Sequence, residues 1–187
     1  HKCHAAAGFQ TSPYNDATVV VIDAIGELDT ISVWDARYDK NGIAVYKKLW
    51  SKKYPDSIGL FYSAMTAKVG LKPLDEEYIL MGMAAYGKKK YAYKFDDYIL
   101  DKPNLDFAYN FHTGAPNNLM SDMDNMDIAA STQAYTEELI CAVMRKANEL
   151  GISDNLVYSG GVALNCSANR LLGNFYKNIW IMPNPGD

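Results

Sequence analysis

Residues 158–165, Tyr158-Ser-Gly-Gly-Val-Ala-Leu-Asn165, are the most diagnostic part of the chain for its architecture. The apolar run from Asn155 to Tyr158 predicts a strand, and the residues from Val162 onward are compatible with a helix. Two glycines between them allow a tight turn whose backbone N–H groups can approach a nucleotide closely. A glycine pair also occurs in α/β turns that serve packing only. Nucleotide binding therefore remains a hypothesis that needs support from other residues.

Two further predicted strand ends carry similar residues. The strand that begins at Thr18 ends in the acidic, glycine-containing turn Asp23-Ala-Ile-Gly-Glu27, and the last part of the sequence is the turn Pro183-Asn-Pro-Gly-Asp187. Ligand clefts of open α/β sheets lie at the carboxyl ends of the strands. Three such ends with Asp or Gly-Gly are what a nucleotide-and-metal cleft requires.

The order of the predicted elements defines the fold class. Strands are expected at 18–23, 30–38, 43–50, 155–158 and 178–182, and helices at 57–69, 76–86, 127–150 and 162–172. The turn Asp39-Lys-Asn-Gly42 predicts a hairpin between the second and third strands. Residues 101–125 are polar and interrupted by prolines, so they are expected to form a loop region around a short strand at 105–111. The order β-β-β-α-β-α-β with a helical insertion at about 57–125 predicts an α/β, ribonuclease-H-like domain with a mixed sheet, the unit that actin-like ATPases use twice.

Composition narrows the class of protein. The 187 residues are 49% hydrophobic and 21% charged, which is typical of a globular domain with a substantial core. A net charge of −4 gives no electrostatic reason to expect nucleic acid or an anionic membrane as a partner. The mixed basic and aromatic segment Lys88–Tyr98 is therefore interpreted as a solvated amphipathic helix. No membrane span or signal peptide is visible, and three widely spaced cysteines indicate reduced thiols, so a cytoplasmic location is expected.

Six blocks of sequence, taken together and in this order, resemble the NodU/CmcH family of O-carbamoyltransferases. They are His1–Phe9, Asp23–Glu27, Ser57–Ser63, Glu77–Gly87, Gly160–Asn165 and Pro185–Asp187. That family is related to Kae1-type proteins within the superfamily of actin, Hsp70 and sugar kinases. Ala24 stands where the family usually has Gly, and Ala85 where it usually has Pro. Neither departure removes a polar group.

The resemblance implies a metal site. The family pattern is similar to His-His-x-x-His, in which the outer histidines bind the metal; His4 matches the last of these and His1 the middle one. Together with Asp23 and Asp187, His4 would form a mixed nitrogen and oxygen ligand set. Such a set suits iron, which we expect first, or zinc or manganese, and the imidazole argues against magnesium. From the residues alone, a solvated His4 and two aspartates that only form turns are the alternatives, and Glu27 either supports the site or is solvated.

The resemblance also implies nucleotide contacts. Asp23, Gly26, Gly160, Gly161, Val162 and Asn165 are expected to contact ATP, and Asn165 is the residue assigned to catalysis, through a polar contact with the acyl-adenylate or the ribose. Without the family, Asn165 is a residue that stabilises the start of a helix. Cys166 beside it has no histidine placed by the sequence to activate it, so a small buried residue is the better interpretation. His112 lies in a polar loop without an identifiable partner.

The implied activity is ATP-dependent carbamoyl transfer. Carbamoyl phosphate would be activated as carbamoyl-adenylate, and a hydroxyl of a small molecule or glycan would then displace AMP. The partners are therefore carbamoyl phosphate and a hydroxyl-bearing acceptor, and a homodimer is an assembly to test. A sugar-kinase-like ATPase and a threonylcarbamoyl-type tRNA modification protein of the same superfamily are the alternatives. A noncatalytic nucleotide-binding or scaffold domain is a third, against which the joint presence of His4, Asp23, Gly160, Gly161 and Asp187 speaks.

The resemblance also predicts how the chain is divided. Residues 1–16 would be the tail of a preceding subdomain and a linker, and residues 17–187 a ribonuclease-H-like nucleotide-binding subdomain. The chain is expected to be an excerpt of a longer protein and to be inactive by itself.

Overall fold

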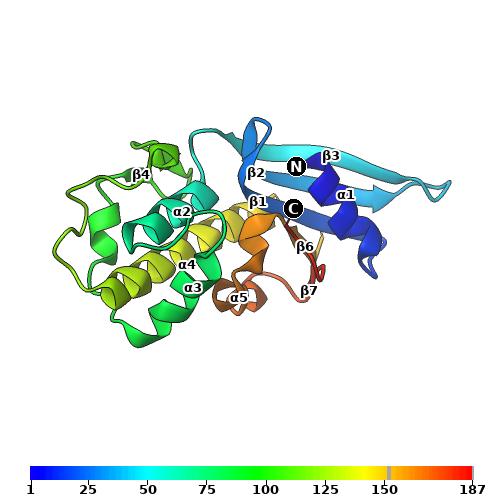
Figure 1. Cartoon of the computed structure of the whole chain (residues 1–187). Coiled ribbons are helices and arrows are strands. Elements are labelled where there is room, and N and C mark those ends of the chain that lie inside the picture. The colour runs from blue at the N-terminus through cyan, green and yellow to red at the C-terminus, as the bar shows by residue number, and fades with distance from the viewer. Residues whose placement is uncertain (151–152, 187) are drawn as a thin grey trace.

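The computed structural model of the chain describes residues 1–150 and 153–186. Its centre is a five-stranded mixed sheet in the order β3-β2-β1-β6-β7 (Figure 1). The strands are β1 (Asp16–Gly26), β2 (Asp29–Tyr38), β3 (Ala44–Lys53), β6 (Asn155–Ser159) and β7 (Asn178–Ile181). The predicted α/β fold with a mixed sheet is therefore confirmed.

β1 holds the central position because it pairs on both sides. It is antiparallel to β2 and parallel to β6, and β6 is parallel to β7. The carboxyl ends of β1, β6 and β7 consequently lie at the same edge of the sheet. The pairing of β1 with β2 becomes irregular between Ile22 and Gly26, so Asp23 lies where the regular ladder ends.

The side chains of β1 alternate between two hydrophobic clusters. Val20 and Ile22 belong to a large cluster, whereas Val19 and Val21 belong to a smaller one on the other face of the sheet. Helix α1 (Lys2–Thr11) covers that second face by burying Ala5 and Phe9. The period of two explains why β1, although almost continuously apolar, supports both layers.

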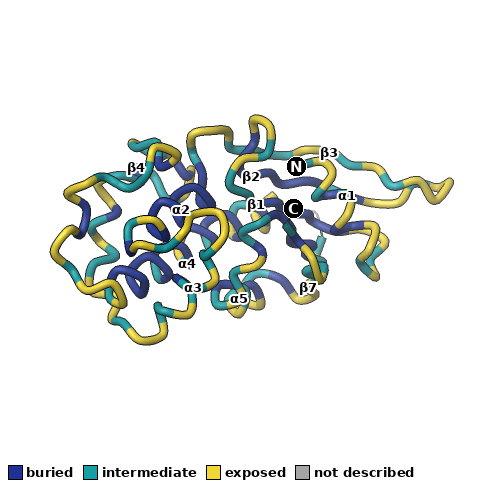
Figure 2. Tube along the Cα trace, viewed as in Figure 1, coloured by how far each residue is buried: buried dark blue, intermediate teal, exposed yellow. Residues whose placement is uncertain are grey.

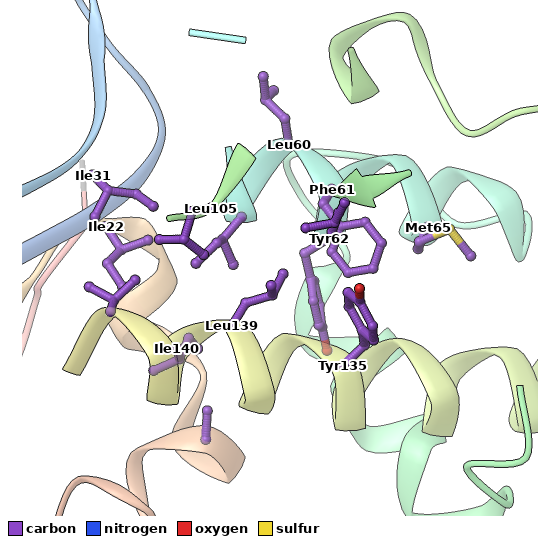
Figure 3. Close-up of a cluster of buried hydrophobic side chains, with 14 of the residues drawn as sticks. Ile22, Ile31, Leu60, Phe61, Tyr62, Met65, Leu105, Tyr135, Leu139 and Ile140 are labelled. Carbon is purple, nitrogen blue, oxygen red and sulfur yellow. The ribbon is translucent and has the colours of Figure 1, made fainter. Parts of the chain in front are cut away.

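The large cluster continues into a helical region beside the sheet, at the end of the molecule opposite the β2–β3 hairpin tip (Figure 1). It contains α2 (Ile58–Lys68), α3 (Glu77–Met83) and α4 (Asn125–Glu149). Helix α2 begins where the Ser57 hydroxyl caps the N–H of Leu60, as expected for a serine at this position. The spacing of Ile58, Tyr62, Met65 and Val69 predicts one apolar face for α2. Residues 58–66 are nevertheless all buried, because β1, α3, α4 and the loop before α4 surround the helix (Figure 2). Phe61 and Tyr62 of α2 and Tyr135 of α4 meet in this core (Figure 3).

The rest of the insertion is built from short elements. These are β4 (Ile99–Asp101), β5 (Asp106–Phe107) and the 3-10 turns η1 (Ala84–Tyr86), η2 (Ala92–Phe95) and η3 (Phe111–Thr113). The prediction of an amphipathic helix over Lys88–Tyr98 is wrong, because only the single turn η2 forms there. The Lys88 N–H and the Lys90 ammonium instead bond to Asp127 at the start of α4. These bonds hold the segment against α4 without a helix. The strand expected at 105–111 is reduced to β5.

The prediction of one continuous helix over 162–172 is also wrong. It divides into the 3-10 turn η4 (Gly161–Leu164), the short helix α5 (Cys166–Asn169) and the turn η5 (Leu172–Asn174). Asn165 causes the first break because its ψ of 81° is not helical and its side chain caps α5 by accepting from the N–H of Ala168. The end of α4 at Gly151 was also expected, but Gly151 lies outside the described residues. Within residues 1–150 and 153–186, no helix is both long and apolar enough to cross a bilayer.

Candidate active site at the sheet edge

Asp23 lies at the carboxyl end of the central strand. Its Oδ1 accepts a hydrogen bond of 2.8 Å from the N–H of Ala24, which fixes the carboxylate at this edge of the sheet. The start of α2 packs directly on the same backbone. A β-carbon built on Gly59 would lie 2.7 Å from Ala24 Cα, and the Ser57 hydroxyl donates to the Ala24 carbonyl at 2.7 Å. The amino end of α2 is therefore held beside the carboxylate.

The two glycines of the turn after β6 have different tasks. Gly160 has a φ of +92°, and a β-carbon there would lie 2.3 Å from the carbonyl oxygen of Ile22, so only glycine fits. Its N–H donates to the carbonyl of Pro185 at 2.7 Å. Gly161 has no such backbone collision: its β-carbon would meet Asp23 Oδ1 at 3.1 Å. Gly160 therefore maintains the turn, whereas Gly161 keeps the space next to Asp23 open.

His4 reaches the same edge from α1. Its Nε2 lies 3.0 Å from Oδ2 of Asp23, and the two side chains are 15% and 14% exposed. The Ser159 hydroxyl donates to the His4 carbonyl at 3.1 Å, which joins α1 to the end of β6. The structure thus brings together two of the predicted metal ligands.

The geometry of this pair fits a shared cation. Ligand nitrogen and oxygen atoms lie about 2.0–2.2 Å from a transition metal, so two ligands of one ion come within roughly 3 Å of each other. The His4–Asp23 separation has this value. A direct ion pair or hydrogen bond would give the same distance.

The third predicted ligand, Asp187, lies outside the described residues. The preceding residue, Gly186, lies at the site, because a β-carbon built on it would be 3.4 Å from Gly161 Cα. Within the described part of the chain, no group of three or more His, Cys, Asp or Glu side chains could hold a metal. The three-ligand set therefore stays a prediction.

His1 and Gly26 lie apart from this edge. His1 Nδ1 is 2.7 Å from the Ser32 hydroxyl of β2, and a β-carbon on Gly26 would collide with the His1 ring. Both residues, with the exposed Glu27, line a small hollow of about 270 Å³ and are not among the residues around the Gly161 cleft. Close packing against the His1 ring thus explains why a glycine stands at position 26. The expected contact of Gly26 with the nucleotide stays a prediction.

A larger cleft, of about 750 Å³, opens from the Asp23–Gly161 edge toward α2 and α3. At the sheet edge it is lined by Asp23, Gly161, Val162 and Asn165, as well as by Gly186. Its opposite wall includes Ser63 of α2 and Glu77 and Tyr78 of α3. The predicted nucleotide residues other than Gly26 and Gly160 thus line one cavity of a size typical for small-molecule sites.

The cleft contains polar residues that the sequence did not single out. Glu77 was quoted only as part of the Glu77–Gly87 block, yet its carboxylate accepts from the Ser63 hydroxyl and the Leu74 N–H, both at 2.6 Å. Tyr62 lines the cleft and Gln133 hydrogen-bonds both Tyr62 and Asn165. A glutamate in the first turn of a helix, such as Glu77, has no local signal that separates a cleft wall from ordinary stabilisation of the helix start.

Asn165 lies where both of its expected roles can be filled, at the start of α5 and on the wall of the cleft. Its Oδ1 accepts from the N–H of Ala168 at 3.0 Å and so caps α5, while its side chain also lines the cleft. Cys166 beside it is exposed rather than buried, and its Sγ lies 3.9 Å from Sδ of Met81. His112 has a partner after all: its Nδ1 is 3.3 Å from the Tyr54 hydroxyl.

Comparisons with known proteins show the family of the chain. A family model described as the N-terminus of carbamoyltransferases matches residues 1–187. A protein of Synechocystis sp. is 40% identical over 216 residues, which cover 100% of this chain and 34% of that protein. The nodulation protein NolNO of Sinorhizobium fredii is 26% identical over 198 residues, covering 98% of this chain and 28% of that protein. The chain therefore spans about a third or less of these relatives.

One solved structure shows the fold. Component A of (R)-2-hydroxyglutaryl-CoA dehydratase from Acidaminococcus fermentans superposes with a TM-score of 0.54 at 21% sequence identity. The match covers 97% of this chain and 60% of that chain. At this identity the likeness concerns the fold alone.

Proposed function

Because the chain belongs to the family of carbamoyltransferase N-terminal regions, we propose that the protein is an ATP-dependent O-carbamoyltransferase. Carbamoyl phosphate would lose its phosphate to water, and a carbamate oxygen would attack the α-phosphorus of ATP. This step forms carbamoyl-adenylate and releases pyrophosphate. A hydroxyl of the acceptor would then attack the carbamoyl carbon, and AMP would leave. The ribonuclease-H-like assignment of the sheet belongs to the same proposal and is supported by the strand order β3-β2-β1-β6-β7.

The observation that carries the proposal is the convergence of Gly161 and His4 on the carboxylate of Asp23, which lines the cleft. Gly161 leaves room beside Oδ1 of Asp23, and His4 lies on Oδ2 of the same carboxylate. A glycine turn followed by free backbone N–H groups can hold phosphate oxygens close to the backbone. The cleft beyond it is large enough for a nucleoside.

The residues of the chain would divide the work as follows. Gly161 admits the phosphates, and the backbone at the start of η4 donates to them. Val162 and Asn165 line the cleft beyond the turn, where the nucleoside would lie. His4 and Asp23, together with Asp187, would hold the divalent cation, for which iron is expected first. When bound, that cation would neutralise phosphate charge and so make AMP a better leaving group.

Adenylation has a chemical reason. Carbamate is a poor electrophile because its carbonyl carbon carries a negatively charged oxygen, and attachment of AMP supplies a leaving group. Donors fixed in advance along the phosphates stabilise the charge that develops during both transfers. The acceptor class in the proposal is a hydroxyl of a small molecule or glycan.

Product analysis tests this function. The full-length protein is incubated with ATP, carbamoyl phosphate and a panel of hydroxyl-bearing acceptors, and nucleotides are separated by chromatography. The proposal predicts AMP and pyrophosphate, formed only when carbamoyl phosphate is present. ADP formed with a sugar alone would move the assignment to the kinase-like alternative.

A further inference from the structure

We propose that Gln133 is a positioning residue that fixes the amide of Asn165, so that Asn165 meets the bound nucleotide as a hydrogen-bond donor. The inference rests on the proposed function for the identity of the ligand. Gln133 lies on α4, is 5% exposed, and reaches the cleft wall from the helix behind it. Nothing in its sequence context, the middle of a long helix, points to this role.

The two amides form a reciprocal pair. Gln133 Nε2 donates to Asn165 Oδ1 at 3.0 Å, and Asn165 Nδ2 donates to Gln133 Oε1 at 3.0 Å. α4 and α5 are separated in sequence, and this pair links Asn165 directly to the long helix, beside the contacts that Glu137 of α4 makes with Ser167 and Arg170. Each amide uses one donor and one acceptor in the pair.

Neighbours on both sides decide which way the amides point. The backbone N–H of Ala168, which can only donate, bonds to Asn165 Oδ1 at 3.0 Å. At the other end, the carboxylate of Glu137 accepts from Gln133 Nε2 at 3.1 Å. Turning either amide over would place donor against donor or acceptor against acceptor. The orientation of the pair is therefore determined by groups whose own roles are fixed.

Tyr62 completes the arrangement from α2. It extends from α2 to α4 (Figure 3), and its hydroxyl donates to Gln133 Oε1 at 2.8 Å. Burial raises the pKa of this hydroxyl, and its hydrogen bond with Asn165 opposes that effect only in part. Tyr62 therefore keeps its proton and remains a donor at neutral pH.

The consequence concerns what Asn165 can offer a ligand. Its Oδ1 already accepts two hydrogen bonds, from Ala168 and Gln133. One N–H of Nδ2 goes to Gln133, and Asn165 is also hydrogen-bonded to the Tyr62 hydroxyl. An oxygen brought into the cleft would compete with Tyr62 for the second N–H. A ligand atom at Asn165 must therefore be an acceptor, such as a phosphate, acyl or ribose oxygen of the nucleotide.

Affinity measurements with matched variants test the proposal. ATP binding is measured by calorimetry on the full-length protein, and melting temperatures are recorded in parallel. Gln133→Leu removes both hydrogen bonds between Gln133 and Asn165 and is expected to weaken ATP binding about five- to tenfold, the effect of roughly one hydrogen bond. Thr132→Ala is the control, because the buried Thr132 hydroxyl has no partner in the described part of the chain and Thr132 does not line the cleft.

A double-mutant cycle separates positioning from general stability. Asn165→Asp keeps an oxygen that can cap α5 but loses the Nδ2 donor, so it is expected to weaken ATP binding at least tenfold with little change in melting temperature. If Gln133 acts through Asn165, adding Gln133→Leu to Asn165→Asp has no further effect on affinity. Should Gln133→Leu fail to fold, the isosteric Gln133→Glu replaces it, since it keeps the acceptor for Tyr62 and removes the donor to Asn165.

The outcomes are distinct. Unchanged ATP affinity in Gln133→Leu or Gln133→Glu, or additive losses in the double variant, would overturn the role of Gln133 while leaving the proposed function intact. Wild-type protein that binds no ATP would overturn the proposed function and this inference together.

Discussion

Nε2 of His4 lies 3.0 Å from Oδ2 of Asp23, although His4 belongs to the helix on one face of the sheet and Asp23 to the end of the central strand. The contact exists because α1 packs on β1 and β6 through Ala5 and Phe9, which carries His4 to the carboxyl edge. Packing of α1 through Ala5 and Phe9 does not itself require a histidine at position 4. The pair is the strongest geometric support for the predicted metal site.

His4→Ala and Asp23→Asn should each abolish stoichiometric binding of a divalent metal by the full-length protein. His4→Ala removes one of the two ligand groups that fit a single cation, and Asp23→Asn replaces the charged carboxylate by a neutral amide, a much weaker ligand. Metal content is measured by plasma mass spectrometry after purification in the presence of iron, zinc or manganese. His112→Ala is the matched control, because the ring of His112 lies against Tyr54 and is not one of the predicted metal ligands. Full metal content in His4→Ala, with only a lowered melting temperature, would show that the contact is an ion pair.

Gly161→Val is expected to reduce ATP affinity at least a hundredfold while the melting temperature changes little. The β-carbon would lie 3.1 Å from Asp23 Oδ1, and the branched methyl groups would fill the entrance through which the phosphates approach the turn. Calorimetric titration with ATP provides the measurement. An unchanged affinity would mean that the glycine pair is only a packing turn.

Gly160→Ala is expected to lower the stability of the fold, whereas Gly161→Val is expected to act on ATP affinity. An added β-carbon would lie 2.3 Å from the Ile22 carbonyl oxygen, and the φ of +92° is unfavourable for any other residue. Chemical denaturation followed by circular dichroism should show a lower free energy of unfolding than for Gly161→Val. Equal stability of the two variants would contradict the division of tasks between the glycines.

Phe61→Ala is expected to lower the free energy of unfolding by about 3–5 kcal/mol, as for other large-to-small changes in a packed core. Phe61 is fully buried, and its ring lies 4.9 Å from that of Phe95 and 5.1 Å from that of Phe111 between ring centroids. The same cluster supports α2 and thereby the cleft wall. Tyr93→Ala, at an exposed position of the insertion, should change stability by less than about 0.5 kcal/mol. A small effect of Phe61→Ala would mean that the insertion does not share the core of the sheet.

Much of the fold was predictable because local signals agreed with tertiary structure. The run from Thr18 to Asp23, the hairpin turn at Asn41-Gly42, the apolar pattern over 57–69 and the glycine pair each predicted an element that the structure contains. The helix expected over 162–172 was not predicted in detail, because the non-helical backbone at Asn165, where the side chain caps α5, interrupts a run that is otherwise compatible with one helix. Over Lys88–Tyr98 the pattern predicted a helix, whereas the Lys88 N–H and the Lys90 ammonium bond to Asp127, a residue far away in the sequence.

The candidate site was predicted where motifs lie at strand ends and missed where helices supply the wall. Asp23, Gly161 and His4 follow from strand-end chemistry and from the resemblance to carbamoyltransferases. Tyr62 and Gln133 could not be found in this way, because a buried polar residue within a helix has no local signature that separates a site wall from a core. The prediction for Asp187 remains open, as that residue lies outside the described part of the chain.

Exchange of labelled pyrophosphate into ATP tests the central claim most directly, because it reports reversible adenylation without requiring the acceptor. The full-length protein is incubated with ATP and labelled pyrophosphate, with and without carbamoyl phosphate, and label in ATP is counted. The account predicts exchange only with carbamoyl phosphate, and its loss in Gly161→Val. Absence of exchange in wild-type protein that binds ATP, or exchange that is independent of carbamoyl phosphate, would contradict it.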